Sequence, residues 1–295
     1  MPAMVSMILC MLLQGCCLGG NSIIQKKSQQ GRLNTLADSA VYTTILAFFQ
    51  ALIYLCLPPY GPFPTAPAFY GYTAVFSVGF FGQLALFMLA FRLGPASMTG
   101  TIRNLNMLVP ITLGLFLWGE KLTAAKIIGL AIFIAAMFLM NKGGYSVDGK
   151  AQKISSRWLI TSISLLVVCG LCGSISKQVM LLYPGVEKTY LLMYNLIVIL
   201  IGIPLCIIHR KKALELLRDR QFLLLVFITA ILMATADFIY VTFVPKYDSA
   251  FFMPLSSTVS MISVMIFSRI FLKEKITGRA LIAAALCIVA VIILS

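Results

Sequence analysis

The sequence predicts an all-α integral membrane protein of ten transmembrane helices, arranged as two inverted five-helix repeats. Three observations indicate this fold class: the apolar composition, ten apolar segments of spanning length, and a match between the two halves. Of the 295 residues, 60% are hydrophobic and 11% are charged, whereas soluble domains carry about 25% charged residues. Lipid must therefore be the solvent for most of the chain. This excludes a soluble enzyme and a nucleic-acid-binding protein, although the net charge is +14.

Ten apolar segments are long enough to cross a hydrocarbon core, which requires about 20 residues per helix. We expect spans at residues 4–25, 36–57, 68–91, 95–118, 122–141, 157–182, 189–209, 221–244, 249–271 and 277–294. No Lys or Arg precedes the first segment, so we interpret it as a retained helix and not as a secretory signal. Residues 210–221 are basic, with Leu214 and Leu217 three positions apart. They predict a short helix lying along the lipid headgroups.

The basic residues are distributed unequally between the two sides of the predicted bundle. The connections after the first, third, fifth, seventh and ninth spans, together with the adjoining span ends, contain 17 Lys and Arg residues, and the other connections with their adjoining span ends contain four. Because Lys and Arg are retained on the cytoplasmic side, we predict that both termini are non-cytoplasmic. We expect a multi-pass protein of the plasma (inner) membrane.

The two halves of the chain match at an offset of 154 residues. Glu120-Lys121-Leu122-Thr123 corresponds to Glu274-Lys275-Ile276-Thr277, each before an apolar run. We therefore divide the chain into a first five-helix repeat at 1–141, a polar linker at 142–156 and a second repeat at 157–295. Since each repeat has an odd number of spans, the second must enter the membrane from the opposite side. Inverted repeats of this kind are a transporter architecture.

With these motifs the sequence resembles the drug/metabolite transporter superfamily, specifically its EamA-like members. The resemblance rests on the segment 118–123, Trp-Gly-Glu-Lys-Leu-Thr, and on its degraded counterpart at 272–277. It implies that spans 1, 3, 4, 6, 8 and 9 line a central cavity, while spans 5 and 10 pack at the periphery. Familiar members are often drawn with both termini cytoplasmic, which is the reverse of the orientation that the charges predict here.

Arg103 is the clearest candidate for a substrate-binding residue. It lies about eight residues into the fourth span, or ~12 Å at 1.5 Å per residue, close to the middle of the membrane. Thr99, Arg103, Asn106 and Pro110 form one polar stripe at helical spacing. Ionisable residues inside a membrane are costly and commonly functional, and an arginine binds carboxylate or phosphate through two parallel hydrogen bonds. A structural ion pair is the alternative.

Asp237 is the acidic residue placed well inside a span, with Tyr240 one turn further on and Gln83 at the equivalent position of the first repeat. A carboxyl group away from water and cations holds a proton more readily, which would suit Asp237 for coupling transport to protons. Alternatively, it pairs with Arg103 or Lys177.

Lys177 lies in the sixth span, where it either faces the cavity or reaches the membrane interface with its long side chain. Asn21 belongs to a weaker polar stripe on the first span. The predicted substrate-binding residues are Arg103, Asn106, Thr99, Gln83, Asp237, Tyr240, Lys177 and Asn21. Together Arg103, Lys177 and Asp237 carry a net charge of +1, which favours an anionic or amino-acid-like substrate.

The eight cysteines predict neither a metal site nor a disulfide framework. Cys169 and Cys172 have CxxC spacing, but no second pair or histidine cluster accompanies them, so we interpret them as small residues packed in membrane helices.

The function that these features favour is secondary active transport of a small metabolite by alternating access. Nothing resembles a Walker A sequence, so we expect no ATP hydrolysis. A membrane enzyme would need a nucleophile or paired acids near the interface, which the isolated Asp237 and the single histidine, His209, do not supply, so we expect no enzymatic activity and no cofactor. The expected partners are a small-molecule substrate and the lipid bilayer, with no nucleic acid, and assembly as a homodimer stays open. The alternatives are a non-transporting membrane sensor or assembly subunit, and a membrane enzyme that acts on lipid-linked intermediates.

Overall fold

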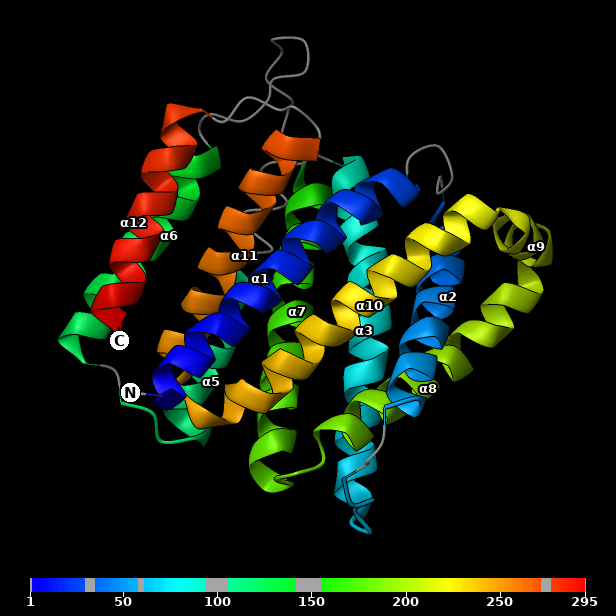
Figure 1. Cartoon of the computed structure of the whole chain (residues 1–295), viewed down its shortest axis with the longest axis horizontal. Coiled ribbons are helices and arrows are strands. Elements are labelled where there is room, and N and C mark those ends of the chain that lie inside the picture. The colour runs from blue at the N-terminus through cyan, green and yellow to red at the C-terminus, as the bar shows by residue number, and fades with distance from the viewer. Residues whose placement is uncertain are drawn as a thin grey trace.

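The structure, a computed structural model, describes residues 2–29, 35–57, 61–93, 105–121, 123–141, 155–271 and 277–294. Within these ranges all regular elements are helices (Figure 1). They are α1 (Pro2–Gln29), α2 (Leu36–Leu55), α3 (Pro67–Leu93), η1 (Leu105–Met107), α5 (Leu108–Leu117), α6 (Ala124–Asn141), α7 (Ser156–Leu182), α8 (Glu187–Ile208), α9 (Arg210–Arg218), α10 (Arg220–Phe243), η3 (Val244–Lys246), α11 (Ser249–Phe271) and α12 (Gly278–Leu294).

Seven of the described helices are long and apolar enough to cross a membrane. They fall on the predicted spans 1–3 and 6–9, while three shorter apolar helices fall on the predicted spans 4, 5 and 10. The prediction of a helical, multi-pass membrane protein is therefore confirmed. Ten complete crossings and the inverted repeat stay predictions.

Capping side chains fix where several helices begin. Thr35 accepts a hydrogen bond from the backbone N–H of Asp38, whose carboxylate accepts one from the backbone N–H of Thr35, and this capping box starts α2. The Ser155 hydroxyl accepts a hydrogen bond from the backbone N–H of Trp158 and caps α7. The Asp219 carboxylate accepts one from the backbone N–H of Phe222 and caps α10, while Asp219 also ends α9. Polar capping residues thus mark where α2, α7 and α10 begin.

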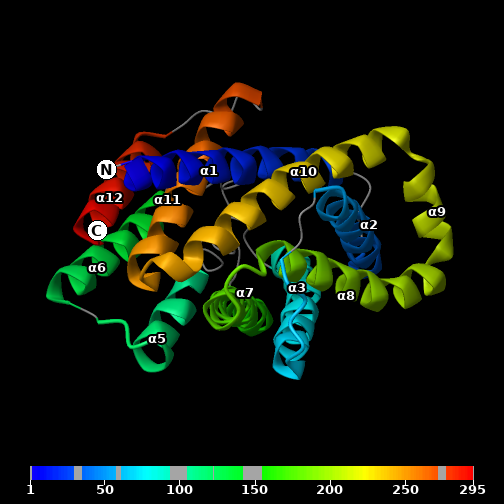
Figure 2. The same ribbon diagram turned by 60° about the horizontal axis from the view of Figure 1, so that its bottom comes forward.

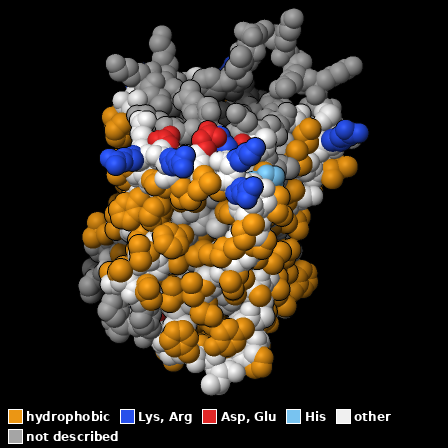
Figure 3. Space-filling model, turned by 90° about the vertical axis from the view of Figure 1, so that its right-hand side faces the viewer, with side chains coloured by type: hydrophobic (Ala, Val, Ile, Leu, Met, Phe, Trp, Pro, Cys, Tyr) orange, Lys and Arg blue, Asp and Glu red, His pale blue; other side chains and the backbone are white. Residues whose placement is uncertain are grey.

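The short helix predicted at residues 210–221 is present as α9, which ends at Arg218. Its Ala213 and Leu216 are buried against the bundle, whereas Leu214 and Leu217 are exposed. Figure 3 shows Lys and Arg side chains gathered near one end of the molecule, above a surface of hydrophobic side chains. This segregation agrees with a helix at the boundary between the apolar belt and the headgroups.

The helices pack in specific pairs. The first helix, α1, packs on α10 and α11, α3 packs on α7 and α8, and α2 packs on α8. The pair α6 and α12 forms one edge of the bundle (Figures 1 and 2). We call the side on which α5, α7 and α10 end and α3, α8 and α11 begin the termini side, because both chain ends lie on it.

The contact between α1 and α11 requires a residue without a side chain at position 19. A Cβ atom built on Gly19 would lie 2.8 Å from the backbone carbonyl carbon and the Cβ of Ser263. Small residues commonly permit this close approach of membrane helices.

We expect Gly19→Ala to lower the free energy of unfolding by about 1–3 kcal/mol, because the added methyl overpacks this contact. Gly71→Ala is the matched control, since a Cβ there meets nothing within 4 Å. The better helix propensity of alanine should leave that variant equal or slightly more stable. Thermal unfolding of the purified variants in one detergent measures both. Equal melting temperatures for the two variants would contradict the close contact.

Candidate functional site

A cavity of about 290 Å³ lies between the helices. Its lining residues come from α1, α3, η1, α5, α7, α8, α10 and α11. They are Gln14, Leu18, Phe76, Phe80, Gln83, Asn106, Met107, Pro110, Cys169, Gly170, Cys172, Gly173, Ser176, Tyr190, Leu191, Tyr194, Met233, Ala236, Asp237, Tyr240, Val241, Met253, Ser256 and Ser257. All six spans that the resemblance implies contribute, together with α8, the seventh predicted span. Among the described residues, α6 and α12 contribute none.

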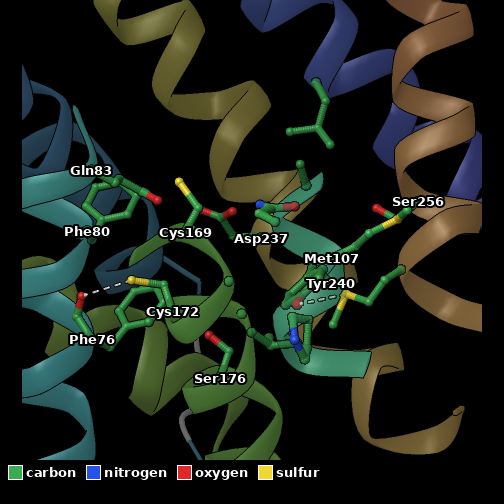
Figure 4. Close-up of a pocket in the computed structure, with 18 of the residues that line it drawn as sticks. Phe76, Phe80, Gln83, Met107, Cys169, Cys172, Ser176, Asp237, Tyr240 and Ser256 are labelled. Atoms are coloured by element: carbon green, nitrogen blue, oxygen red, sulfur yellow. Dashed lines mark hydrogen bonds between the residues drawn. The ribbon is translucent and has the colours of Figure 1, made fainter. Parts of the chain in front are cut away.

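Asp237 is the acidic residue in this lining. Its Oδ2 accepts a hydrogen bond from the Tyr194 hydroxyl at 3.1 Å and faces the amide Nε2 of Gln50 at 3.4 Å. Tyr194 and Gln50 are themselves buried. Figure 4 shows Asp237 near the centre of the cavity, with Gln83 and Ser256 on opposite walls. Neutral donors thus fix the carboxylate while it still borders open space.

Aromatic rings form one wall of the cavity. The ring of Phe76 lies 4.9 Å from that of Tyr194 and 5.5 Å from that of Tyr190, measured between centroids. The Tyr190 hydroxyl shares a hydrogen bond of 3.0 Å with the Ser176 hydroxyl. A carboxylate beside aromatic faces can bind a cation by direct pairing and by attraction to the ring faces.

Four of the predicted substrate-binding residues meet at this cavity: Gln83 from α3, Asn106 from η1, and Asp237 and Tyr240 from α10. The Tyr240 hydroxyl points to the sulfur of Met253 at 3.5 Å. Thr99 and Arg103 lie outside the described residues. The cavity thus combines amide, hydroxyl and carboxylate groups from helices of both halves.

Lys177 and Asn21 are buried but do not line the cavity. Lys177 is 3% exposed and its ammonium forms an ion pair of 2.5 Å with Glu120, whose side chain is 8% exposed. Its ammonium therefore stays inside the protein and pairs with Glu120 instead of Asp237. The charge sum made from the sequence left out Glu120. The described charges of Lys177, Asp237 and Glu120 sum to −1, and Arg103 lies outside the described residues. The balance no longer favours an anion over a zwitterion.

The structure adds site residues that the sequence reasoning missed. Tyr190 and Tyr194, one helical turn apart on α8, line the cavity with fully buried rings. Gln50 supports Asp237 from α2. A polar residue within the apolar run 36–57 was the available signal for Gln50, whereas tyrosines near a span end carry no comparable signal.

The CxxC pair lies within α7, and no disulfide joins its two cysteines. Cys169 and Cys172 border the cavity (Figure 4). Among the described residues no group of three or more His, Cys, Asp or Glu side chains is placed to hold a metal ion.

Comparisons with known proteins agree with this architecture. Residues 5–142 match the model of the EamA-like transporter family. A solved structure described as "Crystal structure of protein" aligns with a TM-score of 0.69 over 98% of this chain and 96% of that chain, at 15% sequence identity. At this identity the likeness shows a shared fold alone. The search of curated proteins finds no match.

Proposed function

Since the chain belongs to the drug/metabolite transporter superfamily, which the EamA-like match over residues 5–142 supports, we propose that it is a secondary active transporter that works by alternating access. The observation that carries this proposal is the cavity itself, which lies between helices of both halves and contains the carboxylate of Asp237. Transporter substrates commonly bind near the midplane, at the interface of two repeats.

The helix packing supports a division into repeats at 1–141 and 157–295. At the offset of 154 residues, α1, α2 and α3 correspond to α7, α8 and α10. A two-fold relation would require each helix pair to recur with the partners exchanged. The packing fits this requirement: α1 contacts α10 as α7 contacts α3, and α2 contacts α10 as α8 contacts α3. Rocking of one half against the other would then open the cavity to alternate sides.

The substrate that the cavity favours is small and amino-acid-like. An ammonium group would pair with Asp237 beside the rings of Phe76 and Tyr194. Arg103 remains the predicted partner for a carboxylate, with Asn106 and Gln83 as hydrogen-bonding groups. The volume of about 290 Å³ lies near the lower limit of ligand pockets, which suits a small metabolite.

We further propose that the protein resides in the plasma membrane with both termini non-cytoplasmic. The basic helix α9 would then lie at the cytoplasmic surface, where anionic lipids attract Lys and Arg. The uneven distribution of basic residues in the sequence supports this orientation.

Transport by the purified protein tests the proposal. Thermal stabilisation would first select ligands from a set of amino acids, amines and carboxylates, and proteoliposomes loaded with a selected ligand would then be tested for exchange of its radiolabelled form. We expect saturable exchange that excess unlabelled ligand suppresses. Stabilising ligands without any exchange would favour a non-transporting sensor, and chemical conversion of a lipid-linked compound would favour an enzyme.

A further inference from the structure

Glu120, the acidic residue of the 118–123 motif, lies at a junction of three helices on the termini side. Its Oε1 accepts hydrogen bonds from the Lys177 ammonium on α7 and from the Ser249 hydroxyl at 3.0 Å. Its Oε2 accepts one from the backbone N–H of Ser249, the first residue of α11, at 2.9 Å. The carboxylate thus binds both a cation and the N-terminus of a helix, which attracts negative charge.

Lys177 is fully engaged in the same junction. Besides Glu120, its ammonium donates to the backbone carbonyl of Tyr247 and to the hydroxyl of Ser249, both at 2.9 Å. It also lies 4.8 Å from the ring centroid of Trp118. An ammonium has three N–H donors, and all three have partners here. The pair is therefore satisfied only while the ends of α5 and α7 and the start of α11 are together.

The local backbone directs Glu120 into this junction. After α5 ends, the N–H groups of Trp118 and Glu120 both donate to the carbonyl of Gly114. A Cβ built on Gly114 would lie 2.5 Å from Oε2 of Glu120, so only glycine leaves room for the carboxylate. The turn of the motif thus folds the acidic side chain back against its own helix.

The junction lies next to the cavity, towards the termini side. Ser176, beside Lys177, and Met253, one turn beyond Ser249, both line the cavity. Glu120 follows a helix of the first half, whereas Lys177 and Ser249 belong to the second half. Movement of the two halves apart on the termini side would separate Glu120 from both partners.

We propose that Glu120, Lys177 and Ser249 form the gate that closes the cavity towards the termini side, so that each transport cycle breaks and re-forms this junction. The proposal rests on the proposed transporter function, because a gate acts only in an alternating-access cycle. It gives Glu120, the acidic residue of the 118–123 motif, a mechanical role at one end of the cavity. This role is separate from the substrate contacts proposed for Asp237. A buried ion pair favours two distinct states. While the junction is closed, each charge is stabilised by its partner, and after the junction opens, the separated charges are stable only where water reaches them.

Side-specific labelling of a cavity cysteine tests the gate without measuring transport. Ser257→Cys, placed in a chain whose eight native cysteines are replaced, provides a reporter in the cavity lining. A second chain retains only Cys56, which is exposed at the end of α2 on the termini side. The side of the membrane from which a membrane-impermeant maleimide labels Cys56 is the termini side. Labelling rates are measured from each side of the membrane.

With Glu120→Gln we expect the reporter to be labelled at least about tenfold faster from the termini side, which corresponds to a loss of about 1.4 kcal/mol from the closed state. Labelling from the opposite side should fall or stay constant. Glu215→Gln is the matched control, because it removes an ion pair with Lys212 that lies within α9, where Glu215 is 67% exposed. We expect no change in its labelling.

A second variant keeps the proposal testable if Glu120→Gln does not fold. Gly114→Ala changes no charge but occupies the space of the Glu120 carboxylate, so it should also raise labelling from the termini side. Unchanged labelling in both folded variants, or an equal rise from both sides, would overturn the gate. An absence of transport in the parent protein would instead contradict the proposed function and leave the labelling result standing.

Discussion

Asp237→Asn is expected to lower the rate of substrate exchange in proteoliposomes by about 100-fold, which corresponds to a loss of about 3 kcal/mol. Asparagine keeps the size and the hydrogen bond from Tyr194 but removes the charge that would pair with a substrate ammonium. Tyr194→Phe should have a smaller effect of about tenfold, because it leaves the carboxylate in place and removes one hydrogen bond, for which we take the lower end of the range for a charged acceptor, about 1.5 kcal/mol.

Glu215→Gln is the matched control for this loss of a carboxylate. Glu215 lies on α9, is 67% exposed, and forms an ion pair of 3.0 Å with Lys212. Exposed ion pairs of this kind contribute little, so we expect exchange at the parental rate. If Asp237→Asn also exchanges at that rate, Asp237 is not part of the substrate site.

The same variant separates substrate binding from proton coupling by Asp237. If the carboxylate binds substrate, Asp237→Asn loses exchange both with and without a pH gradient. If it only carries the coupling proton, exchange without a gradient persists and accumulation driven by the gradient is lost. Parallel assays with and without an imposed pH difference distinguish the two roles.

The helices could be predicted closely from the sequence because lipid imposes a simple rule on them. The span expected at residues 249–271 is α11, Ser249–Phe271, and the span expected at 36–57 is α2, Leu36–Leu55. Continuous apolar length decides these segments, and prolines and capping residues decide their ends. How the helices pair is not determined by apolar length, since every span is hydrophobic on most of its surface.

The candidate site was predictable where a polar residue interrupts an apolar span. Asp237, Asn106 and Gln83 each interrupt an apolar span, and all three line the cavity. The interior position of Glu120 could not be predicted, because the residue follows the end of its span and is buried only by the turn at Gly114 and the start of α11. Its partner Lys177 was consequently assigned to the cavity or to the interface.

Lys177→Met is expected to lower the free energy of unfolding by about 3–5 kcal/mol, because it leaves the Glu120 carboxylate buried without its cation. The matched control is Lys126→Met, which removes the partner of Asp248 on the same side of the protein. Lys126 is 17% exposed and Asp248 is 50% exposed, so that loss should be at most about 1 kcal/mol. Denaturant titration of both variants in the same lipid–detergent mixture measures the difference, and equal losses would contradict the burial of the pair.

The double variant Glu120→Gln/Lys177→Met separates stability from gating. Replacing both members of a buried ion pair by well-packed apolar side chains of similar volume is often neutral for stability. The Gln–Met pair likewise leaves no buried charge without a partner, so the double variant should regain at least half of the stability that Lys177→Met loses. The reporter cysteine in the cavity should nevertheless remain open to labelling from the termini side, because the neutral pair no longer draws the three helix ends together. Recovery of stability together with parental labelling would show that the ion pair stabilises the fold without holding a gate.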